Sequence, residues 1–234
     1  KHGLEELNIT LTDEQIEQFL QYYEMLVEKN KVMNLTGITE YEEVIQKHFL
    51  DSLSLIRVIP DIASQKLTVI DLGTGAGFPG IPLKIAFPEL EITLMDSLNK
   101  RILFLQEVID ALGLKKVSAV HGRAEEMASN ATHRQQYDLC VSRAVSNLAV
   151  LTEYCLPFVK KGGLFVSYKS ADSDAEIQEG KKAISILGGK LTSVDKFQLP
   201  DSDLRRALVC IKKVKDTPKK YPRKAGTPAK LPLK

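Results

Sequence analysis

Two segments within the first sixty residues carry apolar side chains at helical spacing. Thr12 and Gln15 form a capping box, which predicts a helix that starts directly after Thr12. Thr39 and Glu42 form a second box, and Pro60 ends the segment that follows it. The apolar positions are Ile16, Phe19, Leu20, Tyr23 and Leu26 in the first segment and Ile45, Phe49, Leu53 and Ile56 in the second. We therefore predict an N-terminal helical extension over residues 1–60.

From residue 67 onward, short apolar runs alternate with helical stretches. The runs predict strands at residues 67–72, 92–95, 117–121, 137–142, 164–168, 191–197 and 207–211. Helices are predicted at residues 79–87 and 102–112, the second of them closed by Gly113. This alternation favours an α/β fold over residues 61–214, with a mostly parallel sheet and helices on both of its faces.

Composition places the chain among ordinary globular proteins. Of its 234 residues, 44% are hydrophobic and 26% are charged, which excludes collagen-like, low-complexity and wholly disordered chains. No apolar run approaches the roughly 18 to 20 residues that cross a bilayer, so we expect no membrane association. The cysteines, Cys140, Cys155 and Cys210, are too far apart for a Cys-x-x-Cys pair, and we expect no metal. We expect a monomer in the reducing cytoplasm.

Charge is distributed unevenly along the chain, although the net charge is only +2. Residues 212–234 hold nine basic side chains and one acid, whereas residues 1–211 hold 23 basic and 29 acidic ones. A basic tail on an acidic body indicates a polyanion partner, because neutralised phosphates release counterions; a solvated tail that aids solubility is the alternative. Four prolines between residues 218 and 232 predict that the tail, residues 215–234, is extended rather than helical.

The most informative stretch is Val69-Ile-Asp-Leu-Gly-Thr-Gly-Ala-Gly-Phe-Pro-Gly80. A predicted strand runs directly into Gly73, Gly75 and Gly77, whose missing β-carbons let the backbone turn tightly and approach a ligand closely. Asp96 follows at the end of the next predicted strand, where it can accept hydrogen bonds from ribose hydroxyls. A tight turn without a ligand is the alternative, but one or two glycines would suffice for it.

Two cofactors fit this pattern. Gly75, Gly77 and Gly80 satisfy the Gly-x-Gly-x-x-Gly spacing of dinucleotide-binding enzymes, in which a helix N-terminus binds a pyrophosphate. In those enzymes the first glycine of the motif directly follows the strand. Here Gly73 directly follows the predicted strand, and Gly75, the first glycine of the match, comes two residues later. Asp71 would repel a pyrophosphate but could attract the sulfonium of S-adenosylmethionine. S-adenosylmethionine is therefore favoured over NAD.

Further motifs make the likeness to known proteins specific. The chain resembles the RsmG (GidB) family, the bacterial 16S rRNA guanine-N7 methyltransferases, within the class I S-adenosylmethionine-dependent methyltransferases. The motifs that carry this resemblance share one order along the chain: Asn34-Leu-Thr36, His48-Phe-Leu-Asp-Ser52, Asp71-Leu-Gly-Thr-Gly-Ala-Gly77, Phe78-Pro-Gly-Ile-Pro82, Asp96-Ser-Leu-Asn-Lys-Arg101, Gly122-Arg-Ala-Glu125, Ser142-Arg-Ala144 and Tyr221-Pro-Arg-Lys-Ala-Gly226. The resemblance implies a Rossmann-like, seven-stranded sheet with a reversed last strand, preceded by helices.

The resemblance also implies site residues. Those expected to bind the cofactor are Gly73, Gly75, Gly77, Phe78, Asp96, Ala124, Glu125 and Arg143. Ala124 and Glu125 are expected beside the adenine, and Arg143 is expected to reach the site from the fourth strand. Those expected to hold rRNA phosphates are Arg123, Arg206, Lys219, Lys220, Arg223 and Lys224. We expect the tail to act on RNA rather than on the cofactor, because its composition differs so much from that of the pocket.

Each assignment has a structural alternative. Glu125 could be an acid in the first turn of a helix, Arg143 a member of a structural ion pair, and Phe78 a core aromatic. Arg123 and Arg206 could be ordinary surface charges. The NAD-dependent oxidoreductase and a non-catalytic RNA-binding module remain as alternative functions.

Methyl transfer to guanine N7 needs no proton removal before attack, so the reaction calls for orientation and charge placement more than for a general base. The fourth predicted strand ends in Ser142-Arg-Ala-Val145, without the Asn/Asp-Pro-Pro-Tyr/Phe motif of enzymes that methylate exocyclic amines. Cys140 alternates within that strand and is expected in the core. His48 and Asp51 share one helix face, for which we favour a structural or RNA-contacting role. No catalytic residue is assigned, and Arg143 is the candidate for positioning.

Overall fold

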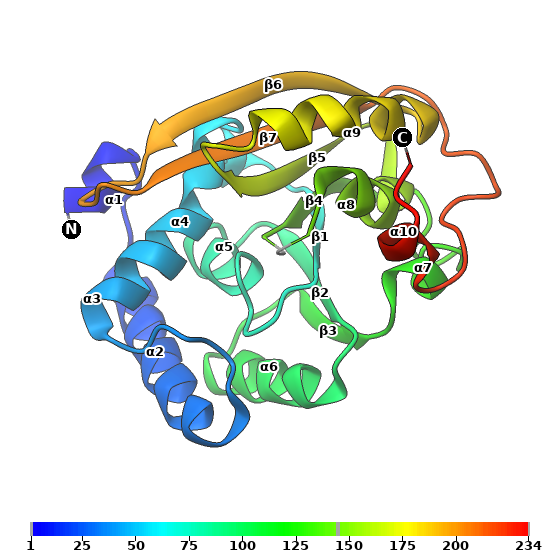
Figure 1. The fold of residues 1–234 in the computed structure, drawn as a ribbon. Coiled ribbons are helices and arrows are strands. Elements are labelled where there is room, and N and C mark those ends of the chain that lie inside the picture. The colour runs from blue at the N-terminus through cyan, green and yellow to red at the C-terminus, as the bar shows by residue number, and fades with distance from the viewer. Residues whose placement is uncertain (1, 144–145, 234) are drawn as a thin grey trace.

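A seven-stranded sheet organises the molecule (Figure 1). The computed structural model describes residues 2–143 and 146–233. The strand order is β3-β2-β1-β4-β5-β7-β6, in which β1 to β5 run parallel and β7 runs antiparallel to both of its neighbours. The strands are β1 (Thr68–Leu72), β2 (Glu91–Asp96), β3 (Val117–His121), β4 (Tyr137–Ser142), β5 (Val159–Ser170), β6 (Gly189–Gln198) and β7 (Arg205–Lys213). The predicted fold class is confirmed, including the reversed last strand.

Neighbouring strands explain why one strand is longer than its apolar run predicted. The run at residues 164–168 is the buried part of β5, but the strand begins at Val159, which pairs with Tyr137 of β4. Lys160, Lys161 and Gly162 add no apolar signal to this extension. Backbone pairing across the sheet therefore sets the start of β5.

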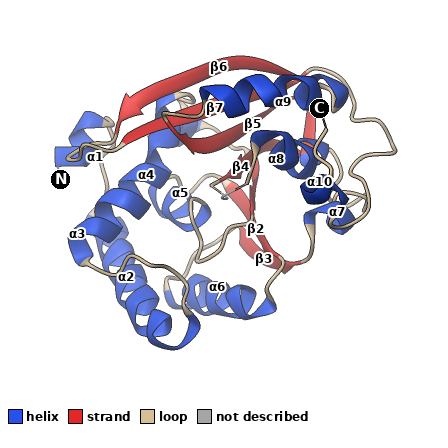
Figure 2. Cartoon of the chain, in the orientation of Figure 1, coloured by secondary structure: helices blue, strands red, loops and turns tan. Residues whose placement is uncertain are grey.

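Helices cover both faces of the sheet (Figure 2). One face is covered by α5 (Gly80–Ala86) and α6 (Asn99–Ala111), which share a core with Val69 and Leu94. The other face is covered by α8 (Leu148–Cys155) and α9 (Asp174–Ile186), whose core includes Ile70 and Cys140. Successive residues of β1 thus face opposite cores, as the pleat of a strand requires. The spacing of apolar residues in the sequence had not led us to predict α8 and α9.

The N-terminal helices add a layer to the first of these faces. They comprise α1 (His2–Glu6), α2 (Asp13–Met33), α3 (Tyr41–Val44), the π-helical η1 (Ile45–Leu50), α4 (Asp51–Leu53) and the 3₁₀ segments η2 (Ser54–Arg57) and η3 (Ile62–Ser64). The capping box of Thr12 and Gln15 is present. The capping box predicted at Thr39 and Glu42 is wrong. Helix α3 begins one residue later than that box implies, and its N-cap, Glu40, makes no side-chain cap hydrogen bond.

The tail packs against the second face instead of extending into solvent. Thr217, Tyr221 and Pro228 are buried, and most of the tail is loop (Figure 2). The prediction that the tail has an extended backbone is wrong at α10 (Thr227–Lys230), a single helical turn that follows Gly226. Proline is tolerated in a first helical turn because the amide that it lacks would have no partner there. Within the described residues, no helix combines the length and apolar character needed to span a membrane.

Tyr22 joins the helical extension to the turn after β1. Its side chain is completely buried, and its hydroxyl donates a 2.6 Å hydrogen bond to the carbonyl oxygen of Ala76. Nearer the start of α2, Gln15 and Gln18 donate hydrogen bonds to the carbonyl groups of Ile85 and Leu112. The extension is thus attached to the sheet layer by polar contacts as well as by a shared core.

We expect Tyr22→Phe to lower the free energy of unfolding by about 1 kcal/mol, because it leaves the buried carbonyl of Ala76 without its donor. Urea unfolding followed by circular dichroism measures this change. Tyr41→Phe, at an exposed position of α3, is the control and should move the midpoint little. A Tyr22→Phe midpoint equal to that of the unaltered protein would contradict the role given to this hydrogen bond.

Candidate functional site

The glycine-rich turn lies between the end of β1 and the start of α5, at the switch point between β1 and β4 where ligands gather in open parallel sheets. Gly73 has a φ of 71° directly after the strand. Gly77 has a φ of 110°, and a β-carbon there would lie 2.7 Å from both the Tyr22 hydroxyl and Cγ1 of Ile81. Only glycine fits this position, because the turn is packed tightly against α2.

Asp71 holds the turn from inside. Its Oδ2 accepts hydrogen bonds from the Thr74 hydroxyl at 2.6 Å and from the Gly80 amide at 2.8 Å. Burial raises the pKa of Asp71 to about 7, although both of these hydrogen bonds act to lower it. The carboxylate of Asp71 is buried and is not among the lining residues of either cavity described below, and its Oδ1 has no hydrogen-bond partner among the described residues, so an attraction between Asp71 and a sulfonium stays a prediction. Asp71 occupies the start of α5, where a dinucleotide pyrophosphate would bind, which disfavours NAD.

A cavity of about 390 Å³ lies at the carboxyl ends of β1, β2 and β3, a size within the usual range for cofactor sites. We call it the smaller cavity. It contains five residues that the sequence analysis named, Gly73, Asp96, Arg123, Ala124 and Glu125. It is also lined by Leu151 and Tyr154, which the sequence analysis missed, and by Gly226, which it named only as the end of a family motif. Nothing in the local sequence of α8 or of the tail indicated that they reach this site.

Asp96 presents its carboxylate at the end of β2. Oδ2 accepts from the Gly75 amide at 2.9 Å, Oδ1 accepts from the Leu98 amide at 2.9 Å, and Arg101 lies 3.2 Å away. A carboxylate has about four acceptor positions. The two amides use two of them and Arg101 shares the other two, so hydroxyl groups in the cavity can bind Asp96 by replacing the partly exposed Arg101 guanidinium. The Arg101 contact was not anticipated, although this residue closes the motif that begins at Asp96.

The remaining residues of the turn lie outside the lining of the smaller cavity. Gly75 supplies its amide to Asp96, and Gly77 packs on Tyr22. Phe78 is buried and stacks on the His48 ring, with 4.4 Å between ring centroids. The Arg143 guanidinium lies 5.1 Å from the centre of the same ring. Phe78 therefore connects the turn to a second cavity.

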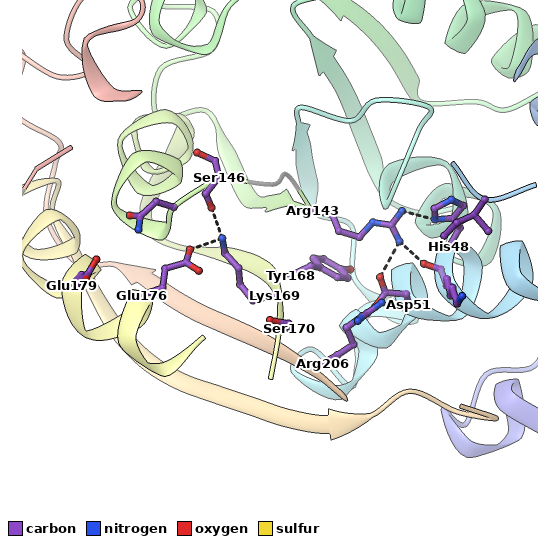
Figure 3. A pocket seen from close by; sticks show the side chains of 13 residues that line it. His48, Asp51, Arg143, Ser146, Tyr168, Lys169, Ser170, Glu176, Glu179 and Arg206 are labelled. Carbon is purple, nitrogen blue, oxygen red and sulfur yellow. Dashed lines mark hydrogen bonds and ion pairs between the residues drawn. The ribbon is translucent and has the colours of Figure 1, made fainter. Parts of the chain in front are cut away.

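The larger cavity, of about 740 Å³, is next to the smaller one, and Ser146 lines both (Figure 3). Its wall comes from the ends of β4, β5 and β7, from η1 and α4 of the helical extension, and from α9, which supplies Glu176 and Glu179. The side chains used in the argument below are His48, Asp51, Arg143 and Arg206. Ala144 and Val145, which belong to the motif after β4, lie outside the described residues.

Arg143 is held by three acceptors from the helical extension (Figure 3). It donates to the Lys47 carbonyl at 3.0 Å, to Oδ2 of Asp51 at 2.9 Å and to Nδ1 of His48 at 3.0 Å. The Nε of Arg206 donates to the other oxygen of Asp51 at 3.2 Å. Asp51 is buried, so one carboxylate fixes two arginines from two different strands. The predicted pairing of His48 with Asp51 on one face is thus used to hold Arg143.

His48 is the neutral member of this group. Because arginine can only donate, Nδ1 of His48 must accept from Arg143, and Nε2 then donates to the Thr36 hydroxyl at 2.8 Å. Burial, reinforced by the charge of Arg143, lowers the pKa of His48 to about 4. A neutral imidazole whose acceptor nitrogen is already bonded is poorly suited to act as a general base.

The tail cations occupy two different environments. Lys219, Lys220 and Lys224 are exposed, whereas Arg223 forms a forked ion pair with the completely buried carboxylate of Glu153. Gly226 of the same tail lines the smaller cavity, a contact that the composition of the tail did not indicate, and whether the tail acts more on RNA than on the cofactor stays a prediction. Sequence spacing could not reveal this contact, because about 70 residues separate Arg223 from Glu153.

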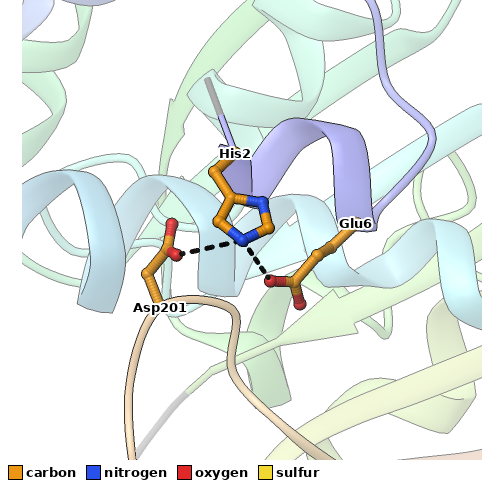
Figure 4. A group of neighbouring side chains, drawn as sticks. All are labelled: His2, Glu6 and Asp201. Atoms are coloured by element: carbon orange, nitrogen blue, oxygen red, sulfur yellow. Dashed lines mark ion pairs between the residues drawn. The ribbon is translucent and has the colours of Figure 1, made fainter.

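Among the described residues, one group of side chains that could hold a metal ion lies outside the lining of both cavities, on α1 and the turn between β6 and β7 (Figure 4). Nε2 of His2 is 3.6 Å from Glu6 and 4.0 Å from Asp201. All three side chains are exposed, where such contacts contribute little. We interpret the group as surface contacts between α1 and this turn.

Solved structures support the fold at low sequence identity. M. jannaschii TYW2, in complex with AdoMet, is 13% identical, with 70% of this chain and 76% of that chain covered and a TM-score of 0.53. A branched-chain polyamine synthase from Thermus thermophilus, bound to 5'-methylthioadenosine, is also 13% identical, with 72% and 57% covered and a TM-score of 0.56.

Sequence relatives are much more similar and extend over nearly the whole chain. A protein of Lachnoclostridium phytofermentans is 58% identical over 99% of this chain and 95% of its own length. One of Alkaliphilus metalliredigens is 54% identical over 100% and 97%, and both are named ribosomal RNA small subunit methyltransferase G. The GidB family model, described as rRNA small subunit methyltransferase G, matches residues 15–209. The chain therefore belongs to the GidB family, as its motifs had indicated.

Proposed function

We propose that this protein transfers the methyl group of S-adenosylmethionine to N7 of a guanine in 16S rRNA. The observation that carries the proposal is the pair of adjoining cavities beside the glycine turn, in a chain that belongs to the GidB family. The smaller cavity would hold the cofactor and the larger one the target nucleoside. Ser146, common to both walls, marks where the two ligands would meet.

The residues of the smaller cavity suit an adenosyl group. Gly73 lets backbone approach the ligand closely, and two ribose hydroxyls would take the acceptor positions of Asp96 that Arg101 now uses. Ala124 and Glu125, which follow β3 and line this cavity, would lie beside the adenine, whose amino group can donate to a carboxylate. Gly75, Gly77 and Phe78 serve the site by shaping the turn, and Arg143 serves it from the larger cavity.

The protein supplies orientation to the reaction. S-adenosylmethionine, when bound, supplies a methyl group activated for displacement, and guanine N7 attacks with a lone pair that needs no base. Holding two reactants in line contributes about 7 to 11 kcal/mol in favourable cases. Arg143, clamped by Lys47, His48 and Asp51, offers a rigid cationic edge to the nucleoside, which makes it a positioning residue.

Basic side chains around the cavities suit an RNA substrate. Arg123 lies at the smaller cavity, Arg206 at the larger one, and Lys219, Lys220 and Lys224 lie exposed on the tail. Each phosphate contact should add roughly 0.7 to 0.9 to the slope of log affinity against log salt concentration. We give Arg223 a different role below, since its guanidinium is held by Glu153. A monomer in the cytoplasm would suffice, because one chain forms both cavities, and the partner would be 16S rRNA or the small ribosomal subunit.

Transfer of tritium from labelled S-adenosylmethionine to small-subunit rRNA, followed by nucleoside analysis, tests the proposal. Label in 7-methylguanosine is the expected result. Label in another nucleoside would overturn the guanine assignment. RNA binding without any transferred label would favour a non-catalytic RNA-binding module.

Loss of the Asp96 carboxylate should weaken S-adenosylhomocysteine binding roughly 10- to 100-fold, the usual effect of charge-assisted hydrogen bonds. Isothermal titration of Asp96→Ala and Asp96→Asn measures it, and the asparagine variant should fall between the alanine variant and the unaltered protein. Asp110→Ala, at an exposed position of α6, is the control. Equal affinity in Asp96→Ala would exclude the ribose-binding role.

The low pKa of His48 predicts how stability depends on pH. Its folded pKa is about 4 against an ordinary 6.5, so between these values the unfolded chain binds a proton that the folded chain does not. Stability from this group is present above pH 6.5 and is lost as the pH falls towards 4, by roughly 3 kcal/mol at most. Urea unfolding across this range should show the advantage of the unaltered protein over His48→Gln shrinking as pH falls.

The control for this series is Ile45→Val in the same π-helical segment, which removes no titrating group and should give a constant offset. NMR provides a second readout, since the His48 imidazole should titrate near pH 4. A midpoint near 6.5, or a constant difference between the unaltered protein and His48→Gln, would contradict the neutral, clamped imidazole.

A further inference from the structure

The segment from Val214 to Leu233, which we call the C-terminal strap, runs from β7 to the smaller cavity. We propose that the strap forms one wall of that cavity and contributes to cofactor binding. Glu153 and Arg223 are then positioning residues that hold the strap there. The inference rests on the proposed function only in taking the smaller cavity as the site of an adenosyl ligand.

The root of the strap is fastened independently of the cavity. Arg134 donates to the carbonyl groups of Thr217, Pro218 and Tyr221, at 2.9 to 3.3 Å. The buried amine of Lys213 donates to the Thr217 hydroxyl at 2.6 Å. These contacts hold residues 217–221 whether or not the rest of the strap is in place. A separate contact must therefore position the part of the strap after Tyr221, which reaches the cavity.

That contact is the ion pair between Glu153 and Arg223. Oε1 of Glu153 accepts from the amide and the Nε of Arg223, both at 2.9 Å, and Oε2 accepts from Nη2 at 2.6 Å. The Glu153 side chain is 1% exposed, in a helix whose other residues are almost all apolar. A buried ion pair contributes little net stability, but it excludes arrangements that would leave its charge unpaired. The pair thus allows only one position of the strap along α8.

This position brings Gly226 to the cavity. Three residues after Arg223, the amide of Gly226 donates a 2.9 Å hydrogen bond to Oε1 of Glu125. Gly226 has a φ of 81°, and a β-carbon there would meet no atom within 4 Å, so its backbone rather than a side chain closes this wall. Among the described residues, no other group is hydrogen-bonded to the Glu125 carboxylate. Its remaining acceptor positions can receive the amino group of an adenine.

The same pair also orients α8 toward the ligand. Leu151 and Tyr154 flank Glu153 in this helix, and both line the smaller cavity. One ion pair therefore sets α8, the strap and, through Gly226, the carboxylate of Glu125 around a single space. The strap also carries exposed lysines proposed to contact RNA, which places RNA and cofactor contacts on one segment.

The simpler alternative is that the ion pair between Glu153 and Arg223 only stabilises the fold. Measuring cofactor affinity distinguishes this structural role from the proposed positioning role. S-adenosylhomocysteine is titrated calorimetrically, well below the melting temperature, into Arg223→Gln, Glu153→Gln and the double variant. We expect each Kd to rise at least about tenfold, with the two losses non-additive because both break one contact. The KM for S-adenosylmethionine should rise similarly, while kcat stays within about threefold.

The matched control is Arg57→Gln, which breaks the ion pair between Arg57 and Asp195, residues outside the lining of both cavities. It should leave the Kd unchanged, and because this pair is partly exposed it should change the melting temperature little. A single variant could fail to fold, since it leaves a buried charge unpaired, and the double variant removes both charges. Folded Arg223→Gln or double-variant protein with an unchanged Kd would overturn the proposal.

Trypsin digestion of the unaltered protein gives an independent readout. Saturating S-adenosylhomocysteine should slow cleavage after the exposed Lys224 by about tenfold or more, because this part of the strap must leave its wall to be cut. Unchanged cleavage would overturn the proposal. If the unaltered protein does not bind S-adenosylhomocysteine, the proposed function fails; if binding depends on Asp96 but not on Arg223, only the strap inference fails.

Discussion

Asp71 ties the two ends of the glycine turn together through one carboxylate oxygen, which accepts from Thr74 within the turn and from Gly80 at the start of α5. Tyr22 holds the same turn from the opposite side through the carbonyl of Ala76. A turn held at both sides keeps Gly73 at the smaller cavity and Phe78 beside the larger one. Both cavities therefore depend on a buried acid that does not line either of them.

Two further buried carboxylates assemble the sites from distant segments. Asp51, in the helical extension, holds Arg143 and Arg206 from two strands, and Glu153, in α8, holds Arg223 from the tail. Burying a carboxylate is costly unless its partner is correctly placed, so such pairs favour a single arrangement of the segments that supply them. The helical extension and the tail thus contribute to the larger and the smaller cavity respectively.

Local patterns predicted the elements whose burial follows from their own residues. The apolar runs at 117–121 and 137–142 coincide with β3 and β4, and the box at Thr12 starts α2. The helix predicted from Thr39 instead begins at Tyr41 and continues as a π-helix, in which the Lys47 carbonyl accepts from Arg143. That contact is tertiary, and no spacing within residues 39–57 encodes it.

The sequence by itself determined the α/β class, the family, and the glycine turn with its acid one strand away, because strand periodicity, glycine conformation and motif order are local properties. Only the tertiary structure decided which charged residues meet. It turned Asp71 inward, clamped Arg143 on His48 and Asp51, and brought Gly226 to Glu125 across about 100 residues of chain. Such pairings depend on how helices and strands pack in space, which the spacing of residues along the chain does not specify.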